Sequence, residues 1–189
     1  MYLGRALLHF NVTYVILYVL IVTLKGDRNM KFSKQIIVNA PAEKVWGVLG
    51  RDFANVGKWA TLVAHSEVNT EAPVVNNSPV GGRLCNTSIG KISEEFTAYD
   101  DSKKTLSFKG VFDSKLFDSV VNSSEISSID ENTALVKITP EIKLSFLGSL
   151  MTPIIKIQLG KAIDKILDDL KYYAENGKPS PAKIASQEK

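Results

Sequence analysis

The sequence predicts an α+β domain in which an antiparallel sheet of six to seven strands wraps around one long C-terminal helix. Short runs rich in β-branched residues recur from residue 62 to 145 at a spacing of roughly 10 to 12 residues, and turn residues separate them. Residues 148–176 then carry apolar side chains at three- and four-residue steps, which is typical of an amphipathic helix. Two short helical segments stand between the first strand and the rest.

The first strand is predicted over residues 32–39, and a short helix follows it. Pro41 suits the first turn of a helix, and Glu43 is favourable at the positive end of the helix dipole. The helix is expected to end near Gly50, and residues 52–59 form a second short helix or a turn.

The strand run after these helices reads as an antiparallel meander, because its connections are short. Gly90 and the polar stretches 100–104 and 130–132 supply the turns. The predicted strands are residues 63–70, 83–89, 91–99, 105–112, 117–129 and 133–145. In the last strand Val136 and Ile138 alternate with Lys137, so one face of the sheet is predicted to be covered and the other wet.

The predicted C-terminal helix should cover that apolar face. Its apolar stripe opposes a stripe of lysines and aspartates, and Gly177 is a natural stop. Residues 30–178 are therefore expected to form one domain. The tail, residues 179–189, is rich in Ser, Pro and Lys and is expected to be disordered.

Cysteine and histidine content argues against disulfides and metal sites. Cys85 is the single cysteine, so no intramolecular disulfide can form, and we expect it to be a small core residue. The two histidines, His9 and His65, do not have a spacing that suggests zinc. We expect no metal and no cofactor.

The formal net charge of +3 is unevenly distributed. Residues 1–29 hold three basic side chains and one acidic side chain, so the remainder carries only +1. The remaining lysines are scattered among carboxylates and form no basic stripe with interleaved aromatics. Nucleic acid is therefore excluded as an expected partner, and a monomer is expected.

Residues 6–24 form a run of 19 residues with no formal charge unless His9 is protonated. A bilayer core of about 30 Å takes about 20 helical residues, so the run is long enough to span a membrane. Three interpretations stay open for residues 1–29: a cleaved signal peptide, a membrane anchor, or upstream translated sequence with Met30 as the true start. The first lacks a small-x-small site before Lys25.

Localisation depends on that choice. The protein is expected to be cytoplasmic if Met30 is the start and membrane-anchored if Met1 is the start. A membrane is an expected partner only if residues 1–29 are expressed. Basic residues on both flanks, Arg5 before the run and Lys25 and Arg28 after it, leave the orientation undecided.

Four segments in the right order carry a family resemblance over residues 31–178. They are Asn-Ala-Pro-Ala-Glu-Lys-Val-Trp at 39–46, Val-Gly-Lys-Trp at 56–59, Gly-Lys-Ile-Ser-Glu-Glu-Phe-Thr-Ala-Tyr-Asp-Asp at 90–101 and Asp-Asp-Leu-Lys-Tyr-Tyr-Ala-Glu-Asn-Gly-Lys at 168–178. The sequence thereby resembles the SRPBCC superfamily, which includes START lipid-transfer domains, birch-pollen-allergen-like proteins and polyketide cyclase/dehydrase-like proteins. Glu95 departs from the pattern, since a basic residue often follows the strand's glutamate there.

The resemblance implies a helix-grip fold with a cavity for a lipid-, steroid- or polyketide-like molecule. Because the superfamily holds enzymes, carriers and regulators, the fold alone does not choose between them. Three hypotheses follow: binding or transfer of an apolar small molecule in a largely apolar pocket between sheet and helix, a cyclase/dehydratase-type enzyme, and a stress- or signalling-related module that binds another protein.

Glu94 and His65 are the candidate catalytic residues. Glu94 shares a strand face with Ile92 and Phe96, so it faces the pocket if they face the core. Desolvation there would raise the pKa of its carboxyl group and suit it to acid/base work. The alternative is a place at the rim or a pairing with a lysine. His65 would titrate near neutral pH, and its alternative is an ordinary surface histidine.

The candidate ligand-binding residues share an apolar or aromatic side chain expected to face the space between the sheet and the helix. They are Trp59, Phe96, Phe108, Ile155, Leu159 and Ile163.

Overall fold

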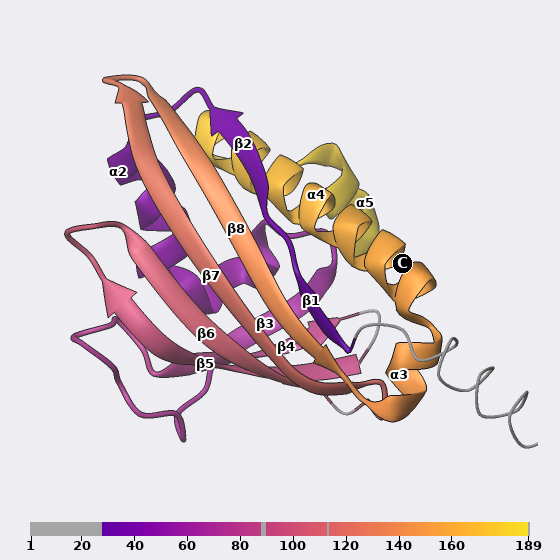
Figure 1. Ribbon diagram of the computed structural model, residues 1–189. Helices are drawn as coiled ribbons and strands as arrows, with labels where there is room; N and C mark the ends of the chain where they lie inside the picture. Colours follow the sequence, from indigo (N-terminus) through magenta and orange to yellow (C-terminus); the bar gives the residue numbers. More distant parts are fainter. Residues whose placement is uncertain (1–27, 88–89, 113, 189) are drawn as a thin grey trace, which may run out of the picture.

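The structure, a computed structural model, describes residues 28–188 apart from 88, 89 and 113. Within these residues eight strands form one antiparallel sheet. The long helix α4 (Thr152–Asn176) runs beside β2 (Lys34–Val38) and β8 (Thr133–Leu144), while the short helical segments of residues 42–58 lie behind the sheet (Figure 1). The expected α+β helix-grip fold is therefore confirmed.

The strands are β1 (Asn29–Lys31), β2 (Lys34–Val38), β3 (Val63–Val68), β4 (Gly82–Thr87), β5 (Gly90–Asp100), β6 (Thr105–Phe112), β7 (Phe117–Asp130) and β8 (Thr133–Leu144). Across the sheet they lie in the order β1-β8-β7-β6-β5-β4-β3, and β2 also pairs with β8. The helices are α2 (Ala42–Trp46), η1 (Gly47–Arg51), η2 (Phe53–Lys58), α3 (Phe146–Leu150), α4 (Thr152–Asn176) and α5 (Pro181–Gln187).

The predicted first strand, residues 32–39, corresponds to β2, and the short strand β1 before it was not predicted, which accounts for the eighth strand. β1 pairs with β8 through Met30 opposite Ile142, and β2 pairs with the same strand through Ile36 opposite Val136. The break lies opposite Pro140, whose ring nitrogen carries no hydrogen. Because proline cannot donate to a ladder, the pairing is interrupted there and resumes on either side.

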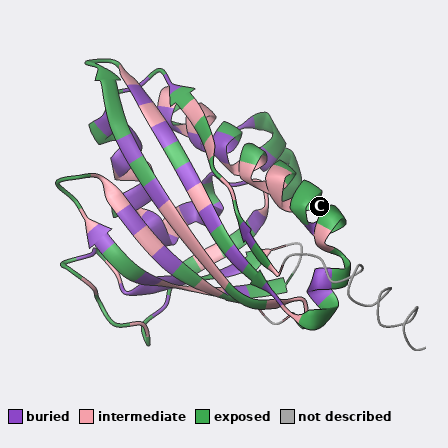
Figure 2. Ribbon diagram, in the orientation of Figure 1, coloured by how far each residue is buried: buried purple, intermediate pink, exposed green. Residues whose placement is uncertain are grey.

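Buried and exposed residues alternate along the strands, so one face of the sheet is buried and the other is exposed to solvent, as Figure 2 shows for β7 and β8. The buried face and the covering helices hold two hydrophobic clusters. The main cluster gathers aromatic side chains from α2, η2, β5 and β6 and is closed by Leu167, Leu170 and Ala174 of α4. The second cluster is smaller and lies under the first half of α4. It consists of Met30, Ile142, Leu144 and Ile155.

Helix α4 follows the predicted pattern and ends where expected. Gly177 takes the left-handed conformation at φ 67°, and its N–H donates to the Tyr173 carbonyl oxygen at 2.8 Å. This is the usual geometry of a glycine that closes a helix. Within residues 28–188 no helix is both long and apolar enough to cross a bilayer. Residues 6–24, and the interpretations proposed for them, lie outside the described residues.

The tail expected to be disordered is instead largely helical, because Pro181–Gln187 form α5. Ser180 caps the helix by accepting a hydrogen bond from the Lys183 N–H, and Pro181 occupies its first position. Lys183 is fully buried, and its Nζ donates to the Val63 carbonyl oxygen at 2.6 Å. The disorder prediction was therefore wrong over these residues, because it weighed composition and overlooked the cap.

Asp169 joins this tail to the rest of the domain. Its carboxylate is 1% exposed and accepts hydrogen bonds from Thr61 N at 2.7 Å, Lys165 Nζ at 2.7 Å and Ser180 Oγ at 3.0 Å. Burial alone would raise the pKa of Asp169, but the hydrogen bonds from Lys165, Thr61 and Ser180 outweigh it and hold the pKa below its ordinary value. The folded protein thus favours the ionised form.

We expect Asp169→Asn to lower the free energy of unfolding near neutral pH by about 2 to 3 kcal/mol, the usual cost of losing hydrogen bonds to a buried charge. A carboxyl whose folded pKa is lowered stabilises the fold above its unfolded pKa, and this stability disappears as the pH falls through the folded pKa. The difference in free energy of unfolding between the unsubstituted protein and the variant should therefore become smaller below about pH 4. Urea unfolding of both proteins, near neutral pH and below about pH 4, measures this difference.

Asp168→Asn is the matched control, because Asp168 is the preceding residue of the same helix and is exposed. Its substitution should change the free energy of unfolding by no more than about 0.5 kcal/mol. Equal losses in the two variants would contradict the anchoring role of Asp169.

Candidate functional site

The strand register places two adjacent rows of side chains on the inner face of the sheet. Residues directly opposite each other in a ladder point to the same face. The first row crosses β4 to β8 through Arg83, Glu94, Gly110, Val120 and Ile142. The second crosses β5 to β8 through Phe96, Phe108, Asn122 and Pro140. Polar and apolar groups are thus mixed on a face that the helices cover.

Glu94 lies on this inner face and forms an ion pair with Arg83. The side chains of Arg83 and Glu94 are only 9% and 14% exposed, and Arg83 Nε donates to Glu94 Oε2. Arg83 Nη1 also donates to the Phe53 carbonyl oxygen at 2.7 Å, and its guanidinium carbon lies 3.9 Å from the centre of the Phe53 ring. The partner is thus an arginine rather than the lysine considered from the sequence, and the acid/base role of Glu94 stays a prediction.

His65 lies on the opposite face. Val63 is buried, but a β-bulge between Val63 and His65 shifts the alternation by one residue, so that Ser66 faces the inner residue Cys85 instead. The imidazole is 65% exposed, and its nearest charged partner is Glu67 at 3.8 Å. The structure therefore does not bring His65 and Glu94 together, and a joint acid/base role for the two has no geometric support.

The six predicted ligand-binding residues all lie on the covered side. Phe96 and Phe108 are buried in the main cluster, with ring centres 4.2 Å and 5.3 Å from that of Phe53. Trp59 is buried in the same cluster and Ile155 in the second one. Leu159 and Ile163 are only partly buried, and their role as ligand contacts stays a prediction.

The boundary between the two clusters is lined by apolar side chains that are only partly buried. Leu159 packs on the second cluster and Ile163 on the main one, so α4 crosses the boundary between them. We call this region the junction strip. Its partly buried apolar members are Phe112, Phe117, Val120, Leu159 and Ile163.

Three buried side-chain polar atoms have no hydrogen-bond partner among the described residues: Trp59 Nε1, Thr61 Oγ1 and Asn122 Oδ1. Such groups are rare in folded proteins, since burial without a partner costs about 1 to 3 kcal/mol. They are therefore candidate polar contacts for a bound molecule. Asn122 was missed from the sequence; the available signal was an amide at an inward position between Val120 and Ser124.

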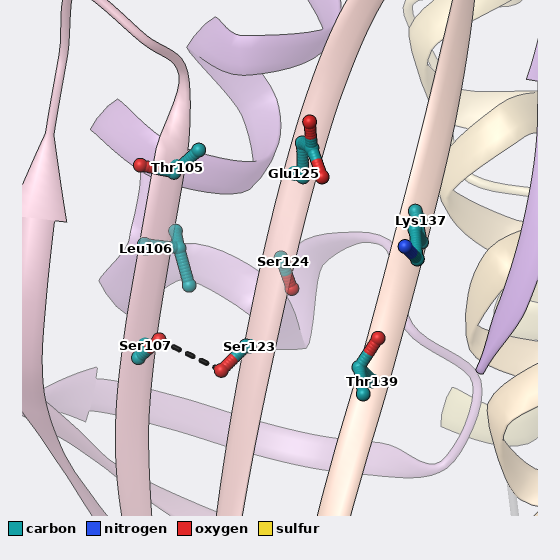
Figure 3. A pocket seen from close by; sticks show the side chains of 8 residues that line it. All are labelled: Thr105, Leu106, Ser107, Ser123, Ser124, Glu125, Lys137 and Thr139. Carbon is teal, nitrogen blue, oxygen red and sulfur yellow. Dashed lines mark hydrogen bonds between the residues drawn. The ribbon is translucent and has the colours of Figure 1, made fainter. Parts of the chain in front are cut away.

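Two surface hollows described for residues 28–188 lie elsewhere. One, of about 180 Å³, is lined mainly by polar side chains on the outer face of β6, β7 and β8, where the Ser107 and Ser123 hydroxyls lie 2.8 Å apart (Figure 3). The other, of about 430 Å³, lies between the β1–β2 connection and α4. Neither matches the largely apolar pocket expected between sheet and helix, because the first lies on the outer face and three lysines and an aspartate are among the residues that line the second.

The described residues contain no group of three or more His, Cys, Asp or Glu placed to hold a metal ion. Cys85 is buried and free, and burial raises the pKa of its thiol to about 12. A thiol with so little thiolate at neutral pH is a poor nucleophile.

Comparison with known proteins agrees with this architecture. The family model described as polyketide cyclase / dehydrase and lipid transport matches residues 29–175. A comparison with curated proteins finds no match.

Three solved structures illustrate the likeness. XoxI from Bacillus cereus is 14% identical, with a TM-score of 0.63 over 77% of this chain and 96% of that one. Zhui aromatase/cyclase from Streptomyces sp. R1128 is 9% identical, with a TM-score of 0.60 over 80% and 99%. A START superfamily protein from Mycobacterium smegmatis is 14% identical, with a TM-score of 0.52 over 74% and 98%. Identities this low show a shared fold only.

We expect Glu94→Gln to lower the free energy of unfolding by about 3 kcal/mol or more, because it leaves the buried guanidinium of Arg83 without a counter-charge. The matched control is Glu95→Gln on the same strand, since Glu95 pairs with Lys109 at 2.9 Å on the outer face. An exposed pair of this kind contributes at most about 1 kcal/mol. Urea unfolding compares the two variants. Equal losses of unfolding free energy would show that the inner pair stabilises the fold no more than the outer one.

Proposed function

Because the chain belongs to the family described as polyketide cyclase/dehydrase and lipid transport, we propose that it binds or transfers an apolar small molecule. The molecule is lipid-, steroid- or polyketide-like and lies between the sheet and α4, at the junction strip. The observation that carries the proposal is the combination found there: apolar side chains that the helix covers only in part, beside an amide oxygen that is buried and unpartnered.

This combination is what a small-molecule site requires. Such sites are lined mainly by apolar and aromatic groups, and a few polar groups fix the orientation of the ligand. The apolar side chains of the junction strip supply the wall, and Asn122 Oδ1 supplies an acceptor. A ligand with a hydroxyl group would satisfy this oxygen, and a carbonyl group would satisfy Trp59 Nε1.

The charges on the inner face favour a neutral ligand. Arg83 and Glu94 neutralise each other, so neither is available as a counter-charge for a ligand without breaking a buried pair. The same pairing argues for binding over catalysis, since a general base must be free to accept a proton.

A cyclase/dehydratase-type activity is the second candidate. It rests on one observation: Glu94 is the acidic side chain of the first inner row, and 14% of that side chain is still exposed. In this alternative Glu94 would exchange Arg83 for the substrate, and turnover of a poly-β-ketone substrate would disappear in Glu94→Gln while the fold is retained.

A bulky substitution in the junction strip should block binding. We expect Val120→Trp to weaken the affinity for apolar probes such as a fatty acid, a sterol and an anthraquinone by at least about tenfold, equivalent to 1.4 kcal/mol. Val121→Trp is the matched control, because Val121 is the next residue of β7 and pairs with Lys109 and Glu141 on the outer face. Native mass spectrometry and fluorescence titration measure the affinities, and circular dichroism checks folding. Binding that is equally retained in both variants would place the ligand elsewhere, and no binding of any probe by the unsubstituted protein would refute the proposal.

Replacing the unpartnered amide should discriminate between ligands. Asn122→Leu keeps a similar volume but removes the acceptor, so a hydroxylated ligand should bind about tenfold more weakly. The hydrocarbon analogue of the same ligand should bind equally well or better. A loss that is the same for both ligands would show that Asn122 shapes the site without contacting the hydroxyl group.

A further inference from the structure

Six large apolar side chains lie exposed on two consecutive helices. Their exposed fractions run from 41% to 58%. The six are Phe146, Leu147 and Leu150 of α3, Met151 between the helices, and Ile154 and Ile157 of α4. We call this set the α3–α4 patch; Figure 2 shows exposed stretches on both helices.

The patch is additional to the apolar surface that the fold itself needs. Ile155, between two of its members, is buried in the second cluster and already supplies the inward contact of that turn. Ile154 and Ile157 therefore project from other sides of the helix. Scattered exposed apolar residues need no explanation, but six of them within residues 146–157 indicate an interaction surface.

Basic side chains border the patch. The hollow between the β1–β2 connection and α4 is lined by Lys34, Lys156 and Lys161, with Ile157 of the patch among its walls. Its one acidic residue, Asp164, is paired with Lys34 at 2.9 Å. Among the described residues Lys156 and Lys161 form no ion pair, so the hollow keeps a net positive charge.

The chain enters the fold beside this patch. Leu144 N donates to the Arg28 carbonyl oxygen at 2.7 Å, and Arg28 Nε donates to the Leu144 carbonyl oxygen at 3.0 Å. Leu144 is the last residue of β8 and precedes Ser145, the cap of α3. The uncharged run of residues 6–24 ends only three residues before Arg28, a separation that an extended chain spans in at most about 14 Å.

We propose that the α3–α4 patch and the adjacent basic hollow dock onto the surface of an anionic lipid bilayer. The apolar side chains enter the boundary between headgroups and acyl chains, as on interfacial helices. Lys156 and Lys161 contact the anionic headgroups, to which basic side chains near such a surface are attracted. The nearby apolar run of residues 6–24 favours a bilayer over a protein as the occupant, since it can enter the same membrane. The inference is independent of the ligand-binding proposal.

An environment-sensitive dye on single cysteines tests the docking in the full chain reconstituted in vesicles of phosphatidylcholine and phosphatidylserine. Native Cys85 can stay in place, because it is 3% exposed and its thiol has a raised pKa. The dye is attached at Leu150→Cys in the patch or at Ile129→Cys. Ile129 is 53% exposed near the β7–β8 turn, about 40 Å from α3 along β8.

We expect the fluorescence emission of the dye at position 150 to shift to shorter wavelength in the presence of vesicles, and brominated lipid to quench it. The emission of the dye at position 129 should neither shift nor be quenched. Lys156→Glu combined with Lys161→Glu should reduce the quenching at position 150 at least about threefold in the mixed vesicles, and much less in pure phosphatidylcholine. Quenching as weak at position 150 as at position 129 would overturn the proposal. A blue shift without quenching would also overturn it, because the patch would then be covered by a second copy or by the chain's own residues.

Discussion

The buried guanidinium of Arg83 is the interaction on which the inner side of this domain depends. It pairs with Glu94 across β4 and β5, donates to the Phe53 carbonyl oxygen of η2, and stacks on the Phe53 ring. Phe53 in turn packs on Phe96 and Phe108. One side chain thus fixes the short helices against the sheet and holds the only acid of the first inner row in place. Because both charges are removed from water, losing either one would leave the other uncompensated, which is far more costly than losing a surface pair.

This arrangement explains why the interior is uneven. The aromatic side chains around Arg83 fill the end of the fold under α2 and η2, and the C-terminal half of α4 closes it. Further along the inner rows come Gly110, which has no side chain, and Asn122, which is polar. Neither can extend the apolar packing, so the core separates into two clusters with the junction strip between them. A candidate binding region therefore arises where the sequence interrupts its own hydrophobic pattern.

Elements with strong periodicity could be predicted from the sequence, and those that depend on pairing partners could not. The alternation in β8 and the stripe of α4 identified the covered face and the long helix, and the alternation of Glu94 with Ile92 and Phe96 placed Glu94 on the inner face. The partner of Glu94 depended on the register between β4 and β5, which no local pattern reveals. The face on which His65 lies was left open, because alternation cannot fix it where one bulge shifts the phase of an edge strand. Helix α5 was missed because the composition of the tail outweighed the local cap at Ser180, and because the tertiary contacts of Lys183 and Ser180 cannot be seen in the sequence.

The first turns of α4 connect the two proposals physically. Ile155 and Leu159 face the second cluster beside the junction strip, while Ile154 and Ile157 of the same turns belong to the exposed patch. An α-helix with its side chains is only about 10 Å thick, so a bilayer in contact with one side of these turns would lie about 10 Å from the strip on the other. An apolar molecule that leaves the membrane would then need to pass only this one helix. Since the main cluster secures the C-terminal half of α4 and only the small second cluster holds its first half, the first half is the part that would yield at the lower free-energy cost.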